Sequence, residues 1–198
     1  MDTIVYRIDN NLYINLTNRC NNNCRFCVRG FKKEYESYSL WLEREPSPEE
    51  VIEALNGALT PDISEVVFCG YGEPLYRLDA IVAIGTYLRS KGVKVRLNTN
   101  GQASLISGQD TPSRLKNAVD VVSISLNATS SDAYDELCRP HDKGKAFQSL
   151  LDFADALHEE GIPTVFSVVD SIGEEEIKKA ADIAASHHAV LRVRELIK

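Results

Sequence analysis

Short apolar runs and helical patterns alternate along most of this 198-residue chain. Residues 65–69, for example, form an apolar run bounded by glycine, which is typical of a buried parallel strand. Residues 78–90 instead repeat apolar side chains at helical spacing. Ser47 and Glu50 predict a capping box at the start of another helix. The predicted strands are 12–16, 65–69, 93–97, 121–126, 162–169 and 189–196, and the predicted helices are 47–59, 78–90, 111–118, 130–137, 145–160 and 174–186.

This alternation predicts the fold class. Strands that alternate with helices form a parallel sheet joined by right-handed crossovers. The chain has about six such units, whereas a closed eight-unit barrel needs about 250 residues. We therefore expect an α/β fold, a partial (βα)6 TIM-like barrel with parallel strands, in a single domain over residues 1–198.

Polar and glycine-containing segments follow five of the predicted strands, where the active sites of such folds gather. These segments are 17–27, 70–74, 98–101, 125–128 and 169–173. Glycine and asparagine are ordinary turn residues. If the five segments were only ordinary turns, the acid Glu73 between Gly72 and Pro74 would have no explanation. The five segments are therefore expected to surround one ligand.

The segment Thr17–Cys27, here called the cysteine loop, holds three of the five cysteines: Cys20, Cys24 and Cys27. A structural zinc site normally has four ligands, and iron–sulfur clusters are usually held by four thiolates. Three thiolates would leave one iron of a cubane without a protein ligand, and such an open position favours chemistry. The alternative is a closed, non-catalytic zinc or iron site in which Cys69 is a fourth ligand.

The composition excludes several classes of function. Lys and Arg number 22 against 29 Asp and Glu, so the net charge of −7 argues against general binding to nucleic acids or anionic membranes. No signal-peptide pattern or long apolar run occurs. Five cysteines, mostly clustered, fit a reducing compartment better than a disulfide framework. We expect a cytoplasmic protein with no membrane segment.

The spacing Cys20-x3-Cys24-x2-Cys27, with Phe26 before the third cysteine and Gly72-Glu73-Pro74 after the second strand, resembles the radical S-adenosylmethionine (SAM) superfamily. The resemblance implies that the three cysteines hold a [4Fe-4S] cluster whose free iron binds SAM through its amino and carboxylate groups. Reductive cleavage of SAM then gives methionine and a 5'-deoxyadenosyl radical that abstracts hydrogen from a substrate. Further clusters need several more cysteines, so no auxiliary-cluster domain is expected.

The resemblance also implies roles for individual residues. Glu73 would accept a hydrogen bond from the SAM ammonium, and Gly72 would allow close backbone approach. Phe26 would shield the cluster and border the adenine. Polar residues at the later strand ends would bind the SAM ribose or carboxylate; these are Asn98, Ser125 and Asn127.

The substrate is not implied. The chain resembles short radical SAM proteins associated with TatD-type nucleases in its size and in its motifs Tyr-Gly-Glu-Pro and Ser-Leu-Asn-Ala. Other small members are activators of glycyl-radical enzymes and 7-carboxy-7-deazaguanine synthases. The implied partners are an electron donor such as flavodoxin or ferredoxin, and a TatD-type nuclease. A wide lateral opening in a six-stranded barrel suits a macromolecular substrate or one presented by a partner.

Three further expectations concern side chains outside these motifs. Residues 28–45 mix aromatic and basic residues, and we expect a surface loop that packs Trp41 inward. Cys69 and Cys138 are expected to be packing thiols. Arg192 and Arg194 alternate on the last strand, so they share a face. That face lies either in the barrel interior near substrate or towards solvent on an edge strand.

Overall fold

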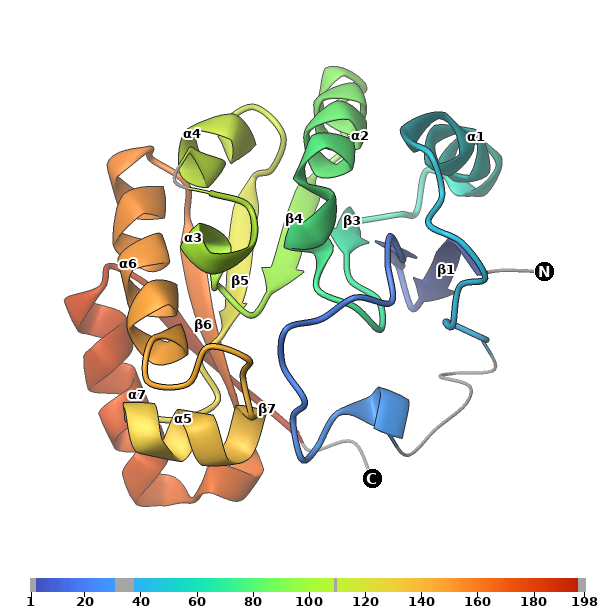
Figure 1. Ribbon diagram of the computed structural model, residues 1–198. Coiled ribbons are helices and arrows are strands. Elements are labelled where there is room, and N and C mark those ends of the chain that lie inside the picture. The colour runs from blue at the N-terminus through green and yellow to red at the C-terminus, as the bar shows by residue number, and fades with distance from the viewer. Residues whose placement is uncertain (1–2, 31–37, 109, 196–198) are drawn as a thin grey trace.

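The computed structural model describes residues 3–30, 38–108 and 110–195. Its strands form a single seven-stranded sheet in sequence order, shown in Figure 1. The strands are β1 (Val5–Ile8), β2 (Asn11–Ile14), β3 (Glu65–Phe68), β4 (Val95–Thr99), β5 (Val121–Ser125), β6 (Thr164–Val169) and β7 (Val190–Arg194). Strands β2 to β7 are parallel, and β1 pairs antiparallel with β2. The sheet is open, so the predicted partial α/β barrel is confirmed.

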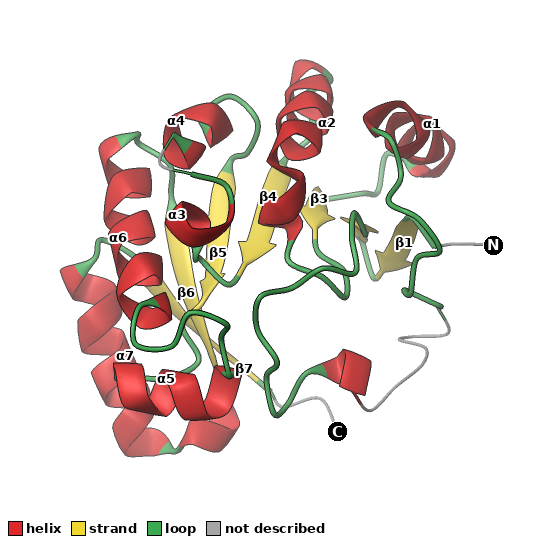
Figure 2. Ribbon diagram, in the orientation of Figure 1, coloured by secondary structure: helices red, strands yellow, loops and turns green. Residues whose placement is uncertain are grey.

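Helices cover the outside of this curved sheet, as Figure 2 shows. They are α1 (Pro48–Ala58), α2 (Leu78–Ser90), α3 (Ala103–Ile106), α4 (Thr111–Leu115), α5 (Ser131–Cys138), α6 (Ala146–Glu159) and α7 (Glu174–Ser186), with short 3-10 helices at Val28–Gly30, Pro74–Arg77 and Asp170–Ile172. The predicted capping box of α1 is present: the Ser47 side chain accepts from the Glu50 backbone N–H at 3.3 Å, and the Glu50 carboxylate accepts from the Ser47 N–H at 2.8 Å.

The structure corrects the predicted elements in three places. It adds β1, which the mixed pattern of the first ten residues does not predict, because β1 depends on antiparallel pairing with β2. It also adds α3, which is only four residues long. The strand expected at 93–97 begins and ends two residues later, so Asn98 and Thr99 belong to β4 rather than to a turn.

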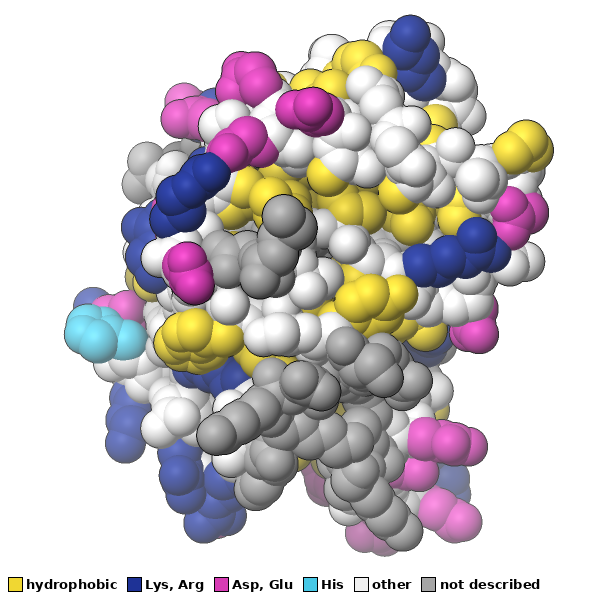
Figure 3. Space-filling view, turned by 90° about the vertical axis from the view of Figure 1, so that its right-hand side faces the viewer, with side chains coloured by type: hydrophobic (Ala, Val, Ile, Leu, Met, Phe, Trp, Pro, Cys, Tyr) yellow, Lys and Arg dark blue, Asp and Glu magenta, His cyan; other side chains and the backbone are white. Residues whose placement is uncertain are grey.

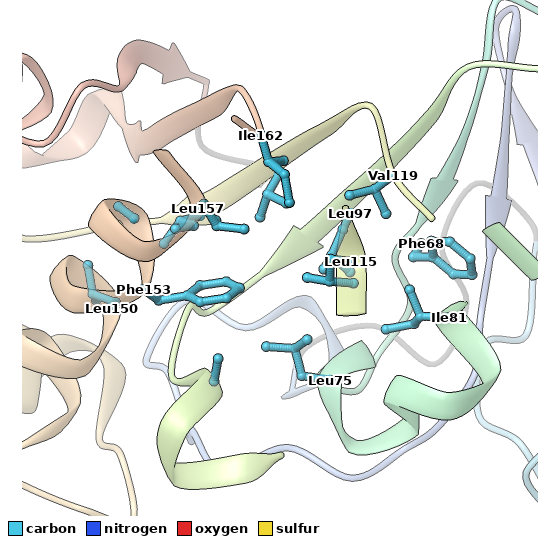
Figure 4. Packing of buried hydrophobic residues seen from close by; sticks show 14 of the residues in the cluster. Phe68, Leu75, Ile81, Leu97, Leu115, Val119, Leu150, Phe153, Leu157 and Ile162 are labelled. Atoms are coloured by element: carbon cyan, nitrogen blue, oxygen red, sulfur yellow. The ribbon is translucent and has the colours of Figure 1, made fainter. Parts of the chain in front are cut away.

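The hydrophobic core lies between the sheet and its helices. Outward-facing strand residues such as Phe68 and Leu97 are fully buried. Figure 4 shows Phe68 beside Ile81 of α2 and Leu97 beside Leu115 of α4, with Phe153 of α6 farther along the same layer. This layer holds the strands in place and leaves their inward faces for other uses.

The inward faces of the strands differ in chemistry from this core. Alternate residues along β3 to β7 line an internal cavity instead of packing on helices; they are Glu65, Arg96, Asn98, Ser123, Ser125, Ser167, Arg192 and Arg194. All eight are polar or charged. Arg192 and Arg194 therefore both line the cavity, and they do so from the edge strand β7, where Arg192 is exposed and Arg194 is half-buried.

The expectation that Trp41 packs inward is wrong, because 58% of this residue is exposed. Its neighbours Leu40 and Leu42 are 2% and 3% exposed. In an extended segment successive side chains point in opposite directions, so burying both leucines turns the tryptophan out. Residues 31–37 of the same predicted loop lie outside the described residues.

The outer surface carries mixed charge. On the face shown in Figure 3, described acidic and basic side chains are interspersed around the edge of the view. Among the described helices, none is long and apolar enough to cross a membrane.

Candidate functional site

A cavity of about 780 Å³ lies inside the open barrel and reaches the carboxyl ends of the strands. Its lining includes every residue that the sequence assigns to the site: Cys20, Cys24, Phe26, Cys27, Gly72, Glu73, Asn98, Ser125 and Asn127. The structure therefore brings together side chains from the cysteine loop and from the ends of three strands.

Backbone hydrogen bonds attach the cysteine loop to the end of α5. The Asn23 N–H donates to the Cys138 carbonyl at 3.0 Å, and the Arg25 N–H donates to the Leu137 carbonyl at 3.0 Å. The loop crosses the open side of the barrel in Figure 1, next to the end of β4. Its path is thus fixed by contacts with segments far away in sequence.

Side-chain amides connect the cysteine loop to the segment after β4. Asn21 donates to Gln102 at 2.7 Å, Gln102 donates to Asn22 at 2.8 Å, and Asn100 donates to Asn21 at 2.7 Å. The buried hydroxyl of Tyr134 accepts from both Asn22 and Gln102 at 3.1 Å. We call these five residues the amide network. Sequence reasoning missed them, although three successive asparagines between two cysteines were a visible signal.

Glu73 is a buried acid, with 3% of the residue exposed. Its carboxylate accepts from the Thr99 hydroxyl at 2.7 Å, the Asn100 N–H at 2.7 Å and the Leu75 N–H at 3.1 Å. Burial raises the pKa of this carboxyl to about 7, and the three hydrogen bonds oppose that rise. Within the described residues Glu73 has no ion pair, so it is suited to a positively charged ligand.

Gly72 lets the turn that contains Glu73 touch the cysteine loop. A Cβ atom here would lie 2.3 Å from the Thr17 carbonyl oxygen and 2.6 Å from that of Arg19. No side chain fits in this space. The neighbouring Tyr71 is buried with Tyr6 and Leu40 in a small separate cluster that also lines the cavity.

The three loop cysteines are half-buried. Burial, together with the nearby Glu73 charge, raises the pKa of Cys20 to about 12. The pKa of Cys24 is also raised, by a hydrogen bond with the Cys138 thiol and by burial. The raised pKa values keep these thiols protonated. A bound metal reverses this preference for the protonated form, because a coordinating thiol loses its proton.

The loop thiols are not gathered around a single-ion site in the described part of the chain. Within the described residues, no three Cys, His, Asp or Glu side chains are grouped tightly enough to hold one metal ion. The closed site that would join Cys69 to the loop cysteines is therefore not formed, although Cys69 lines the same cavity. A cluster presents a separate iron to each thiolate and does not need such tight grouping.

Asn127 has an unused acceptor. Its side-chain N–H donates to the Cys138 sulfur at 3.4 Å, while its buried Oδ1 has no partner among the described residues. The residue has a left-handed backbone with φ of 58° and lines the cavity. A buried acceptor without a donor is costly, so this oxygen fits a ligand that presents a hydroxyl or amino group.

The protein is thus an open, mostly parallel α/β barrel whose cavity is lined by three thiols and a buried acid. The family model of the radical SAM superfamily matches residues 14–184. The chain belongs to this superfamily, whose cofactors are a [4Fe-4S] cluster and SAM.

Curated relatives include a GTP 3',8-cyclase of Corynebacterium glutamicum (strain R), 32% identical over 200 residues, which cover 96% of this chain and 49% of the relative. The UPF0026 protein of Helicobacter pylori is 30% identical over 141 residues, which cover 69% of this chain and 44% of the relative. The chain thus spans about half the length of the curated relatives it matches.

Among solved structures, Streptococcus suis SuiB bound to S-adenosylmethionine is similar with a TM-score of 0.75. The match covers 96% of this chain and 41% of that chain, at 18% identity. At this identity the likeness supports the fold alone.

Proposed function

We propose that the protein is a radical SAM enzyme that abstracts a hydrogen atom from its substrate. The cluster, when bound, supplies the electron that cleaves SAM into methionine and a 5'-deoxyadenosyl radical. The observation that carries the proposal is the buried carboxylate of Glu73, which has no ion pair with a described residue and lines the same cavity as three thiols. A structural metal site has no use for such an acid.

The chain's own residues bind and orient the two cofactors. Cys20, Cys24 and Cys27 hold the cluster, and Glu73 accepts a hydrogen bond from the SAM ammonium. Gly72 keeps this acid against the cysteine loop. The aromatic ring of Phe26 excludes water and borders the adenine. The SAM ribose and carboxylate are held by Asn98, Ser125 and Asn127.

The substrate is large or is presented by a partner, and we base this proposal on the open side of the sheet between β1 and β7. GTP is the first substrate to assay, because curated relatives are named GTP 3',8-cyclase. The electron comes from a donor such as flavodoxin or ferredoxin. An association with a TatD-type nuclease remains a prediction, and co-purification of the two proteins tests it.

Anaerobic reconstitution with iron and sulfide, followed by dithionite and SAM, tests the proposed function. We expect 5'-deoxyadenosine from the wild-type protein and none from a Cys27→Ser variant that fails to retain the cluster. Cys69→Ser is the matched control, because Cys69 lies outside the cysteine loop. A colourless, zinc-loaded protein that does not bind SAM would contradict the proposal.

A further inference from the structure

Polar side chains line much of the interior of this open barrel. Closed barrels of this type fill the interior with bulky branched residues in packed layers. Here Ser123 and Ser167 are buried, with 8% and 3% of each residue exposed, yet they face the cavity. Their hydroxyls are not among the buried side-chain atoms that lack a partner in the described part of the chain. They are open to the cavity and can bind a polar ligand there.

Strand register sets three of the polar side chains in one row. Ser125 on β5 is the partner of Ser167 on β6, and Ser167 is the partner of Arg192 on β7. Paired positions on neighbouring strands lie about 5 Å apart. The hydroxyls of Ser125 and Ser167 make no hydrogen bond within the described part of the chain. Ser125 is assigned to SAM, so the Ser167 hydroxyl is available, with the Arg192 guanidinium, to a second ligand.

The charge on this wall is positive. Strands β5, β6 and β7 contain only two charged residues, Arg192 and Arg194. The third arginine of the interior, Arg96, is already paired with Glu65 at 2.6 Å, whereas Arg192 makes no ion pair with a described residue. The nearest acid in sequence, Glu195, also lines the cavity, and it is exposed, as Arg192 is.

Arg194 extends the positive charge across the cavity. Burial raises the pKa of the Cys69 thiol at the end of β3, and the charges of Arg194 and Arg96 oppose that rise. The charge of Arg194 on β7 therefore acts on Cys69, at the end of β3.

We infer that Arg192 and Arg194, with the Ser167 hydroxyl, bind a phosphate or carboxylate group of the substrate and so fix the substrate's position beside SAM. Guanidinium groups form paired hydrogen bonds with either anion. The inference rests on the proposed function, since it assigns the inner wall to the substrate and the rim to SAM.

Calorimetric titration of the reconstituted, SAM-loaded protein tests the inference, with inorganic phosphate and succinate as separate probes. We expect at least one probe to bind, and Arg192→Gln to raise its Kd by about tenfold or more, because hydrogen bonds to charged groups are strong. Arg194→Gln should act in the same direction, and Arg192→Lys should keep part of the affinity. The matched control is Arg114→Gln on α4, an exposed arginine paired with Asp79 outside the cavity.

The inference fails if the wild-type protein binds neither probe, or if both glutamine variants bind as the wild type does. Tighter binding of phosphate indicates a phosphorylated substrate, and tighter binding of succinate indicates a carboxylic acid. Formation of 5'-deoxyadenosine is measured on the same wild-type preparation. If it forms but no anion binds, the inference fails while the proposed function stands. If an anion binds but no 5'-deoxyadenosine forms, the proposed function fails.

Discussion

At the scale of single residues, the site depends on a carboxylate that the fold keeps from water. Glu73 has a pKa of about 7 because burial outweighs three hydrogen bonds to its ionised form. An ordinary surface glutamate is ionised throughout the neutral range. The charge of Glu73 in the cofactor-free protein therefore changes near physiological pH.

The SAM affinity of the wild-type protein should fall as the pH is lowered through about 7, because protonated Glu73 cannot pair with the SAM ammonium. A Glu73→Gln variant should bind SAM about tenfold or more weakly at pH 8 and lose this pH dependence. Equilibrium dialysis with SAM measures both effects. Glu53→Gln, an exposed acid on α1, is the control. A variant at position 73 with wild-type affinity would contradict the role of this acid.

Two glycines give a matched test of close packing. Gly72→Ala would place a Cβ atom 2.3 Å from the Thr17 carbonyl oxygen, and such overpacking costs about 1–3 kcal/mol of unfolding free energy. Gly57→Ala meets no atom within 4 Å near the end of α1 and should add about 0.4–1 kcal/mol. Urea unfolding measures both changes. Equal effects would show that the contact with the cysteine loop does not constrain position 72.

At the scale of elements, the cysteine loop is positioned by α5 and by the segment after β4. Tyr134 on α5 is fully buried and accepts two hydrogen bonds of the amide network. Replacing Tyr134 therefore removes hydrogen bonds that hold the cysteine loop and leaves the cysteines themselves unchanged.

Tyr134→Phe should lower the unfolding free energy by about 1–3 kcal/mol, because it leaves buried amide donors unpaired. It should also reduce the iron retained after reconstitution. Tyr87→Phe removes one exposed hydrogen bond, to Asn56 at 2.7 Å, and should change stability by less than about 0.5 kcal/mol. Chemical unfolding and iron analysis measure the two effects. Wild-type iron content in Tyr134→Phe would show that the network does not support the loop.

The elements also show what the sequence can predict. The bounds of α2 and α7 agree with the prediction to the residue, because apolar side chains repeat at helical spacing along both helices. The hairpin of β1 and β2 and the amide network were missed. Asn22 and Tyr134, for example, are separated by 112 residues, and no local pattern encodes such a contact. The cavity residues Glu73, Asn98 and Ser125 were predicted because each lies at or after the end of its own strand.

At the scale of the whole molecule, the core and the site occupy opposite faces of one sheet. The buried apolar layer lies between sheet and helices, while the cysteines line the inner cavity. Folding of the helices therefore does not require the cluster.

Removal of iron with a chelator should leave the far-ultraviolet circular dichroism nearly unchanged. It should lower the thermal midpoint by several degrees, because a ligand that binds only the native state stabilises that state. Calorimetry and circular dichroism of the iron-free and reconstituted proteins measure this difference. Loss of helical signal on removing iron would show that the cluster is needed for the fold.

The contacts of Asn100 have a thermodynamic consequence. Its backbone N–H donates to Glu73 and its side chain donates to Asn21 in the cysteine loop, both at 2.7 Å. A single residue therefore contacts both Glu73, which is assigned to SAM, and the loop that carries the cluster ligands, so we expect ordering of one site to order the other. Such coupling is reciprocal: cluster loading should tighten SAM binding by the same factor by which SAM tightens retention of the cluster.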